Sequence, residues 1–392
     1  MLLKRNMGDH MRFVHCLNKI SPVGLQALSS EYQLTDHIDQ ADAILVRSAV
    51  MHDMILPPSV KVVARAGAGV NNIPLDIYAK QGVVVFNTPG ANANGVKELT
   101  IAGMLLASRD IIGGHQWIKE NHDDPEISKT VEKIKSTYGG TEIKGKTIGI
   151  IGLGAIGFEL AKSCVALGMK VIGTKRNLLS LDQEQIPEGM VLVKTKEELY
   201  QSCDFISLNV PLTPDTKGMI DQRAFQKMKD GVILLNFARD TLVNDDDLHE
   251  AILNKKVRCY VTDFPNPKTV NMPNVIAIPH LGASTEEAED MCATMAIHQM
   301  ESYLDHGNII NSVNFPNASL GEKKNHRITL LGDVTLDPMK IQKILATQTI
   351  YRSITQTNGK YTTMIYELSQ ALDKARKEEI IRVPGILHLH IC

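Results

Sequence analysis

The sequence has no long hydrophobic run and almost no net charge. None of its apolar stretches approaches the roughly 20 residues that span a bilayer, so we expect no membrane partner. Its 42 basic and 44 acidic residues give a net charge of -2, which excludes the strongly basic surface that nucleic acid or an anionic membrane recruits. The opening stretch MLLKRNMGDHMRFVHCLNKI lacks the apolar core of a signal peptide, so we expect a cytoplasmic protein whose fold begins near Met11.

Cysteine is also scarce, and its pattern excludes the common cysteine-built sites. The six cysteines are scattered and never form a CxxC pair. We therefore expect reduced structural thiols and no bound metal. Apolar residues, in contrast, make up 43% of the 392 residues, which predicts a globular protein of two or three domains with ample cores.

Short apolar runs alternate with helical patterns from residue 12 to about residue 300. This alternation predicts doubly wound α/β structure with parallel sheets. Residues 95–118 form one long helical pattern between two such series, and another helical stretch at 285–307 follows the last strand. The expected strands lie at 12–17, 43–48, 60–67, 82–88, 146–154, 169–175, 204–210, 231–238, 258–264 and 274–280.

The two series predict two lobes, and the tail predicts a third domain. The first lobe spans 11–108 and is completed by 284–315, because the last helix can carry the chain back to it; the second lobe spans 109–283. After a polar linker at 316–325, residues 326–392 follow the order β-α-β-β-α-β, with TNGK as a hairpin turn. That order predicts a small ferredoxin-like α+β domain.

A glycine-rich turn predicts a nucleotide site. In KTIGIIGLGAIGFELA, the residues Gly152, Gly154 and Gly157 follow an apolar strand and open a helix. The first glycine permits a tight turn, the second lets the backbone approach a pyrophosphate, and the third lets the helix lie close to the sheet. Together with the helix N-terminus at Ala155 and Ile156, this context predicts a Rossmann-type dinucleotide site.

The next strand leaves the choice of dinucleotide open. It ends in Thr174, Lys175 and Arg176, without the acid that bonds the adenosine ribose in NAD sites. Basic residues there suit a 2′-phosphate and hence NADP, but they are explained equally well as solvated surface charge. Both NAD and NADP are therefore candidates.

An arginine stands where a buried strand ends. In GVILLNFARD, the apolar run from Val232 to Leu235 is typical of a strand buried on both faces, and Arg239 follows it. A guanidinium at such a place needs an anion, because it stays protonated at any cellular pH. Arg239 is therefore a candidate ligand for an anionic substrate.

Four segments resemble the D-isomer-specific 2-hydroxyacid dehydrogenase family, in the family's order and at about its distances. They are IGLGAIG, SLNVPLTPDTKGMI, GVILLNFARDTLVNDDDLHEAI and NVIAIPHLGAST, and the resemblance covers about residues 12–315. It implies a nicotinamide cofactor, a Rossmann-type dinucleotide-binding domain and a flavodoxin-like, discontinuous substrate domain. The segments 65–76 and 87–109 resemble most closely the branch that acts on D-3-phosphoglycerate.

The tail from about residue 326 resembles the ACT regulatory domain. Its segment LLGDVTLDPMKI lacks the glycine turn that amino-acid-binding ACT domains usually present. A dimerising module is therefore favoured over feedback by serine.

The resemblance implies roles at the reacting end of a substrate. Arg239 would bind the substrate carboxylate and 2-oxygen, and His280 in IPHLGAS would be the acid/base group. Asp263 would contact the nicotinamide carboxamide or, alternatively, steady His280. This alternative arises because the glutamate that usually orients the histidine is missing, and Asn266 stands about where it would lie. The further cofactor contacts that the resemblance implies are Lys175, Val210, Pro211, Thr216, Ala238, Gly282 and Ala283.

Two more arginines are candidates for the distal end of the substrate. Arg47 in LVRSAV and Arg65 in VARAGAG each end an apolar strand, at the edge of an α/β sheet where sites form. In the phosphoglycerate branch, arginines at these places bind the 3-phosphate or line its pocket. The further donors expected there are Ser48 and the backbone of Ala66, Gly67 and Ala68.

The resemblance thus implies an oxidoreductase that converts D-3-phosphoglycerate to 3-phosphohydroxypyruvate with NAD or NADP, as a homodimer or homotetramer. This reaction is the first step of the phosphorylated route to L-serine. Two alternatives stay open. One is a glyoxylate or hydroxypyruvate reductase of the same family, which Lys175 and Arg176 would suit if the cofactor is NADPH. The other is a nicotinamide-sensing, co-repressor-like binding protein, and the missing glutamate is the feature that supports this alternative.

Overall fold

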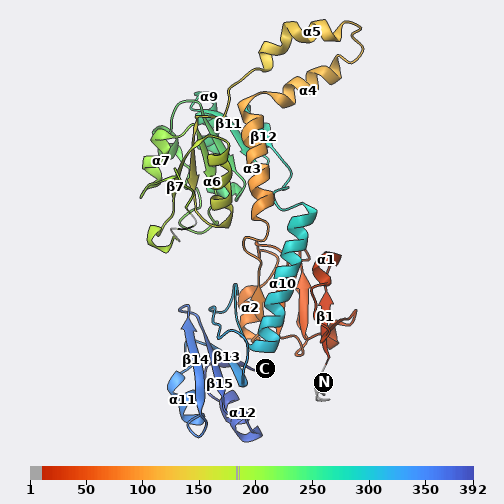
Figure 1. The fold of residues 1–392 in the computed structure, drawn as a ribbon, viewed down its shortest axis with the longest axis vertical. Coiled ribbons are helices and arrows are strands. Elements are labelled where there is room, and N and C mark those ends of the chain that lie inside the picture. The colour runs from red at the N-terminus through yellow and green to blue at the C-terminus, as the bar shows by residue number, and fades with distance from the viewer. Residues whose placement is uncertain (1–10, 182–183, 185) are drawn as a thin grey trace. The chain divides into compact units, whose positions relative to one another are not determined.

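The computed structural model describes residues 11–181, 184 and 186–392, and the first half of the opening segment in which we expected no signal peptide, residues 1–10, lies outside them. The described chain forms two compact units (Figure 1). One contains the described residues up to Asn92 together with Glu286–Cys392, and the other contains Ala93–Thr285. Within the described ranges, no helix is both long enough and apolar enough to cross a membrane.

The first unit is built on a five-stranded parallel sheet. Its strands are β1 (Arg12–Cys16), β2 (Tyr32–Leu34), β3 (Ala43–Val46), β4 (Val62–Arg65) and β5 (Val84–Phe86). They lie in the order β2-β1-β3-β4-β5. The central strand β3 is buried along its whole length, because its residues are apolar on both faces of the sheet. The strand order is that of flavodoxin, so the expected flavodoxin-like lobe is confirmed.

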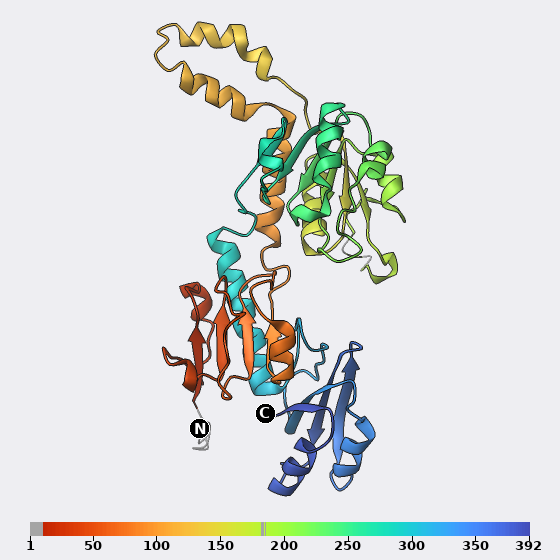
Figure 2. The same cartoon turned by 180° about the vertical axis from the view of Figure 1, so that it is seen from behind.

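The chain returns to this lobe after the second unit. The α-helices that accompany the sheet are α1 (Pro22–Leu25), α2 (Leu75–Lys80) and α10 (Glu286–His306). α10 packs against α1 so closely that a Cβ on Gly24 would lie 2.2 Å from the Cβ of Ala293. Its buried side chains, among them Met300 and Tyr303, complete the core against the sheet. Figure 2 shows α10 running alongside the strands of this lobe.

A four-stranded antiparallel sheet forms the C-terminal part of the first unit. Its elements are β13 (His326–Asp333), α11 (Pro338–Ile344), β14 (Ile350–Thr357), β15 (Tyr361–Leu368), α12 (Lys374–Ile381) and β16 (Ile386–Ile391). The strands lie in the order β14-β15-β13-β16. The expected ferredoxin-like order of elements is therefore confirmed, including the hairpin between β14 and β15.

The second unit is a seven-stranded parallel sheet covered by helices. Its strands are β6 (Thr147–Ile151), β7 (Lys170–Thr174), β8 (Val191–Leu192), β9 (Phe205–Leu208), β10 (Val232–Asn236), β11 (Val257–Thr262) and β12 (Val275–Ala277). Their order β12-β11-β10-β9-β6-β7-β8 is that of a Rossmann fold, as expected. Its α-helices are α3 (Ala93–Ser108), α4 (Ile111–Glu120), α5 (Ile127–Ile134), α6 (Ala155–Ala166), α7 (Lys196–Ser202), α8 (Gln222–Lys227) and α9 (Asp245–Leu253).

The prediction of one long helix at 95–118 is wrong, because α3 and α4 divide this stretch between them. α3 ends at Ser108, and the side chain of Asp110 caps α4 by accepting the N–H of Gly113 at 2.9 Å. α3 packs against α6, β10 and β11, so the boundary between the units falls before α3 and not at residue 108. The edge strands β2 and β8 were not expected from the sequence, since runs of three and two residues carry no readable alternation.

Candidate active site

The glycine turn lies at the carboxyl end of β6, where the strand order changes direction between β6 and β9. Such switch points are where ligands bind in open α/β sheets. Gly152 has a φ of +101°, and a Cβ there would lie 2.4 Å from the carbonyl oxygen of Asn209. A Cβ on Gly157 would lie 2.1 Å from the carbonyl oxygen of Gly152. Both positions therefore require glycine, one for the turn and one for the approach of α6 to the sheet.

Gly154 differs from its neighbours because its surroundings would admit a side chain. Apart from the adjacent residues, no described atom lies within 4 Å of a Cβ placed there. Gly154 is the N-cap of α6, and no side chain caps the first turn at Ala155 and Ile156. Open space at an uncapped helix N-terminus fits the pyrophosphate of a dinucleotide.

The end of β7 lies next to this turn, since the N–H of Gly152 donates to the carbonyl oxygen of Thr174 at 2.9 Å. Lys175 follows and is partly buried. Arg176 forms an exposed ion pair with Asp215, with 3.1 Å between Nη2 and Oδ2. Exposed ion pairs of this kind contribute little to the free energy of folding. A phosphate group could therefore replace Asp215 as the partner of the Arg176 guanidinium.

The loop after β9 carries three of the expected cofactor contacts. Val210 and Pro211 follow the strand at the same edge of the sheet as the glycine turn. The hydroxyl of Thr216 donates to the carbonyl oxygen of Pro211 at 2.7 Å and accepts the N–H of Thr213 at 2.8 Å. These bonds close the loop on itself, so all three residues are held near the carboxyl ends of β6 and β9.

Arg239 is positioned by a buried amide at the end of β10. The side chain of Asn236 accepts the N–H of Ala238 at 3.2 Å and donates to the carbonyl oxygen of Arg239 at 2.8 Å. A second bond to the hydroxyl of Tyr260, 2.9 Å long, anchors the same amide to β11. Among the described residues, no carboxylate lies within ion-pair distance of the Arg239 guanidinium. That guanidinium therefore has no anionic partner within the described protein.

Phe264 contacts both residues expected to do the chemistry. The guanidinium carbon of Arg239 is 5.4 Å from the centre of the Phe264 ring, and the ring centres of Phe264 and His280 are 4.4 Å apart. Arg239 and His280 thus both contact the same aromatic ring within the second unit. His280 is exposed, so its imidazole is open to a ligand.

Asp263 is buried directly after β11 and is tied to the turn that follows His280. Its Oδ2 accepts the N–H of Gly282 at 3.1 Å, and the carbonyl oxygen of Asp263 accepts the N–H of His280 at 3.0 Å. Its Oδ1 is buried and has no hydrogen-bond partner among the described residues. Burial raises the pKa of this carboxyl, against the Gly282 hydrogen bond and the charges of His280 and Arg239. An orphaned acceptor here fits the N–H group of a nicotinamide carboxamide, and Ala283 continues the same turn.

No carboxylate takes the place of the missing glutamate among the described residues. The amide of Asn266 donates to Asp245 at 3.0 Å, and its oxygen accepts the N–H groups of Lys268 and Thr269, each at 2.9 Å. Asn266 therefore shapes its own loop and does not serve His280. Neither oxygen of Asp263 bonds the imidazole, which argues against the alternative that this acid steadies the histidine.

The first unit brings Arg47 and Arg65 together. β3 and β4 pair in register at Val46 and Arg65, so both arginines emerge at one edge of the sheet. The Nε of Arg65 donates to the carbonyl oxygen of Arg47 at 3.1 Å. The Arg47 guanidinium also forms an ion pair with Glu289 on α10, which was not expected from the sequence; its Nη1 lies 2.7 Å from Oε1 of Glu289.

The other expected donors near these arginines are partly engaged. The N–H of Ala66 donates to Val46 at 2.8 Å, and the N–H of Gly67 donates to the carbonyl oxygen of Arg65 at 2.9 Å. These two groups are therefore used within the loop and not presented to a ligand. Ser48 and Ala68 are exposed.

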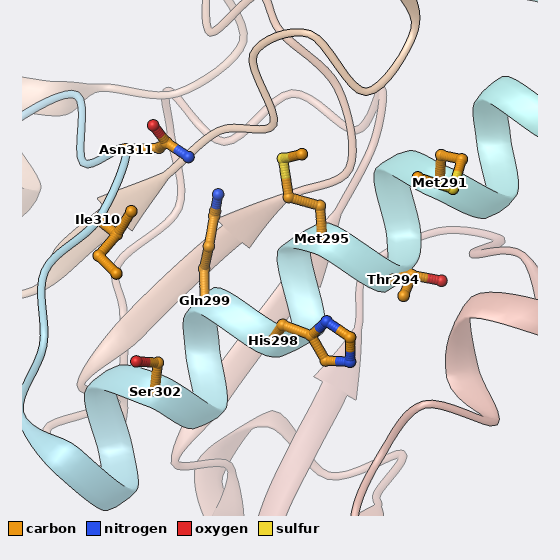
Figure 3. Close-up of a pocket in the computed structure, with 8 residues that line it drawn as sticks. All are labelled: Met291, Thr294, Met295, His298, Gln299, Ser302, Ile310 and Asn311. Carbon is orange, nitrogen blue, oxygen red and sulfur yellow. The ribbon is translucent and has the colours of Figure 1, made fainter. Parts of the chain in front are cut away.

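A cavity of about 540 Å³ lies elsewhere on the first unit, against one face of α10 (Figure 3). Gln299 extends into it from the helix, and both polar atoms of its amide are buried without a partner among the described residues. None of the expected substrate or cofactor residues lines this cavity. Its lining consists of Met291, Thr294, Met295, His298, Gln299, Ser302, Ile310 and Asn311.

Three residues of these sites were missed from the sequence. Asn236 leaves a signal, since it is the polar residue that ends an otherwise apolar strand. Phe264 also leaves one, as an aromatic residue directly after Asp263. Glu289 leaves none, because only the fold brings α10 to the end of β3.

Comparison with known proteins identifies the family. Residues 101–282 match the model of the D-isomer specific 2-hydroxyacid dehydrogenase NAD binding domain, which supports a nicotinamide dinucleotide cofactor. The D-3-phosphoglycerate dehydrogenase of Methanocaldococcus jannaschii is 33% identical over 342 residues, covering 83% of this chain and 63% of the relative. The hydroxypyruvate reductase of Thermotoga maritima is 36% identical over 269 residues, covering 66% of this chain and 83% of the relative.

Solved structures agree with these relatives. The NAD+-bound 3-phosphoglycerate dehydrogenase of Entamoeba histolytica has a TM-score of 0.60 at 25% identity, covering 78% of this chain and 99% of that one. The chain spans about half to two thirds of the length of the curated phosphoglycerate dehydrogenases that it matches. It spans 83% of the hydroxypyruvate reductase. The protein belongs to the D-isomer specific 2-hydroxyacid dehydrogenase family.

Proposed function

We propose that this protein interconverts D-3-phosphoglycerate and 3-phosphohydroxypyruvate with a nicotinamide dinucleotide, in the cytoplasm, as the first step of phosphorylated L-serine synthesis. The observation that carries the proposal is Arg239. Its carbonyl oxygen accepts a hydrogen bond from the Asn236 side chain. Its guanidinium lies over the ring of Phe264, which also contacts His280. A planar, permanently charged fork suits the carboxylate and 2-oxygen of a 2-hydroxy acid.

The proposed chemistry assigns one task to each residue. Arg239 binds the carboxylate and orients C2, which lowers the entropic cost of reaching the reactive geometry. In the oxidation, the proton of the 2-hydroxyl goes to the imidazole of His280, and in the reduction it returns from there. When bound, the nicotinamide accepts the hydride that leaves C2. The orphaned Oδ1 of Asp263 would accept a hydrogen bond from the nicotinamide carboxamide and so fix the face of the ring.

NAD is the proposed cofactor, because the matching family model is that of an NAD binding domain, and NADP is the alternative that the end of β7 suggests. Lys175 at the end of β7 and the exposed Arg176 favour a 2′-phosphate, because no acid stands there to bond the ribose hydroxyls. Breaking the Arg176–Asp215 pair would cost little in solvent. Both cofactors therefore belong in the test.

The substrate's distal end decides between two reactions of the family. Arg47 and Arg65 at one sheet edge support a phosphate. The ion pair that Glu289 makes with Arg47 instead favours a glyoxylate or hydroxypyruvate reductase, since it neutralises one of the two cations. The hydroxypyruvate reductase relative supports the same second candidate.

The test is a comparison of initial rates with 3-phosphohydroxypyruvate, hydroxypyruvate and glyoxylate, each with NADH and with NADPH. A higher kcat/KM for the phosphorylated acid supports the phosphoglycerate reaction. Equal or higher values for the two unphosphorylated acids refute it and favour the reductase. Absence of turnover with every pair, while dinucleotide still binds, favours a sensing protein.

Arg239→Lys isolates the carboxylate contact. It keeps the charge but loses the bidentate fork, so kcat/KM is expected to fall on the order of a hundredfold or more while dinucleotide binding is retained. Arg223→Lys is the matched control, because Arg223 is exposed on α8. Equal activity in both variants would refute the role of Arg239.

The oligomer is proposed to be a homodimer or homotetramer. α4 and α5 contain no buried residue, and Ile111, Ile112 and Ile118 are each about half exposed. Such apolar surface favours contact with another chain. Light scattering after size-exclusion chromatography measures the mass, and a monomer at micromolar concentration would refute the proposal.

A further inference from the structure

Glu289 places a carboxylate at the arginine pair of the first unit. It lies in the first turns of α10, and its Oε1 is 2.7 Å from Nη1 of Arg47. Both side chains are a little over one third exposed, so water and small ions can reach the pair. The pair joins residues that are far apart in the chain, since Arg47 follows β3 and Glu289 lies after the whole second unit.

The position of Arg47 is set independently of this pair. Its N–H donates to Oδ1 of Asn18 at 2.9 Å, and its carbonyl oxygen accepts from Nε of Arg65 at 3.1 Å. Both bonds are made by the Arg47 main chain, so they hold the base of the residue and leave its guanidinium to other partners. Glu289 is therefore not needed to bring the arginine to this edge of the sheet.

Arg47, Arg65 and Glu289 act on one small region. The Arg65 guanidinium lies across the loop at Gly67, where a Cβ would be 2.7 Å from its Nη1. Cys292 lies one helical turn after Glu289, and all three charges act on the pKa of its thiol. Its pKa is raised mainly by burial; both arginines act to lower it and Glu289 acts to raise it further. An anion that reaches Arg47 would thus also meet the like charge of Glu289.

We propose that Glu289 is a specificity-determining residue, an internal carboxylate that competes with the substrate's distal anionic group for Arg47. A doubly charged phosphate must displace or share Glu289 and is repelled by it, whereas a neutral hydroxymethyl group is not. Glu289 therefore narrows the preference for phosphorylated over unphosphorylated 2-oxo acids. The substrate classes named here rest on the proposed function, but the competition at Arg47 does not.

The variant Glu289→Gln tests this at constant shape. The amide keeps an oxygen that can accept from the guanidinium, but it removes the negative charge. Glu287→Gln is the matched control, because Glu287 is exposed on the same helix and its loss changes the net charge equally. The primary readout is the Kd of inorganic phosphate, measured by titration calorimetry on the full chain with the cofactor site saturated by NADH or NADPH.

We expect the phosphate Kd to fall on the order of fivefold in Glu289→Gln and to stay within experimental error in Glu287→Gln, as for one partly screened charge. An unchanged or higher Kd in Glu289→Gln overturns the proposal. An equal fall of the phosphate Kd in both variants also overturns it, because that result would reflect only the change in net charge. The absence of phosphate binding in every variant overturns it as well. If Glu289→Gln does not fold, Glu289→Asp, which shortens the reach to Arg47, should lower the same Kd to a smaller extent, and an unchanged Kd there overturns the proposal.

A kinetic arm separates this proposal from the proposed function. The ratio of kcat/KM for 3-phosphohydroxypyruvate to that for hydroxypyruvate should rise about fivefold in Glu289→Gln. A role in positioning Arg47 alone would change both substrates in parallel and leave the ratio fixed, which overturns the proposal. If the wild-type enzyme prefers hydroxypyruvate, the phosphoglycerate function fails, yet the phosphate Kd still decides the role of Glu289.

Discussion

Glu367 is the carboxylate on which the C-terminal sheet depends most. It lies on β15, fully buried, and its Oε2 accepts from Nη2 of Arg327 at 3.2 Å and from Nε of Arg352 at 2.7 Å. Its Oε1 accepts the N–H groups of Lys324 and Asn325, each at 2.9 Å. One side chain thus joins β13, β14 and the linker that precedes them. We predict that Glu367→Gln destabilises this part of the protein strongly.

The size of the effect follows from the pKa of the carboxyl. Burial alone would raise it, but the N–H of Lys324 and the guanidinium groups of Arg352 and Arg327 lower it from 4.5 to about 2. At about 1.36 kcal/mol per pKa unit, this difference corresponds to about 3 kcal/mol of folding free energy. Removing one partner of a buried pair also costs about 3–5 kcal/mol, because a charge is left uncompensated.

The pH dependence has a definite sign. A carboxyl whose pKa is lowered in the fold stabilises the protein fully above its unfolded pKa and loses that contribution as the pH falls. The stability difference between wild type and Glu367→Gln should therefore be about 3 kcal/mol at pH 7 and should shrink between about pH 5 and pH 2.

Urea denaturation followed by circular dichroism measures this difference, and hydrogen exchange of peptides from β13 and β15 locates it. Glu379→Gln is the matched control, because Glu379 is exposed on α12 of the same sheet domain. The reasoning is refuted if Glu367→Gln is as stable as the control at pH 7. It is refuted equally if the difference persists unchanged at pH 2.

Three further predictions concern single residues. Gly154→Ala should leave the melting temperature unchanged but weaken dinucleotide binding on the order of tenfold, because its Cβ enters only the open space above α6; unchanged affinity in a titration of NADH would contradict this. Gln299→Met should raise the melting temperature by roughly 2–6 °C, since it removes a buried amide without partners, and a lower value in calorimetry would contradict it. Asp263→Asn should raise the melting temperature at pH 7 by roughly 2–4 °C, because burial raises the pKa of this acid and its ionised form opposes folding as the pH rises. If its melting temperature instead shows the same offset from wild type at pH 4 and pH 7, Asp263 does not act through its charge.

The hydrophobic periodicity of the sequence was sufficient to predict the fold class. The strands β6 and β10 are continuous apolar runs because both faces of a parallel sheet are covered, and such runs are visible in any sequence. Breaks in regular patterns were harder to see. The chain leaves the helical path at Asp110 because an N-cap forms there, although the apolar pattern continues across it. The two-residue strand β8 is too short to leave a pattern at all.

Local motifs were sufficient for the second unit's candidate residues, because parallel strands end at one edge of a sheet. The glycine turn, Arg239 and Asp263 each follow directly after a strand, so their convergence could be expected. The side chains that these residues contact could not be predicted in the same way. The Asn236 side chain bonds the main chain at Arg239, and the Phe264 ring contacts Arg239 and His280. Those contacts depend on side-chain rotamers, which no sequence pattern encodes.

The two parallel sheets, the ferredoxin-like order of the tail and the residues at the strand ends could all be predicted from the amino-acid sequence. These features depend on neighbours in the chain and on periods of two and 3.6 residues. Which charged side chains form ion pairs depends on how distant segments pack in the fold. Glu289 reaches Arg47 because α10 returns to the first lobe, and Glu367 reaches Arg327 because β13 and β15 pair. Ion pairs between distant segments have no local signature, since a charged side chain looks the same in a sequence whether it faces water, a partner or a ligand.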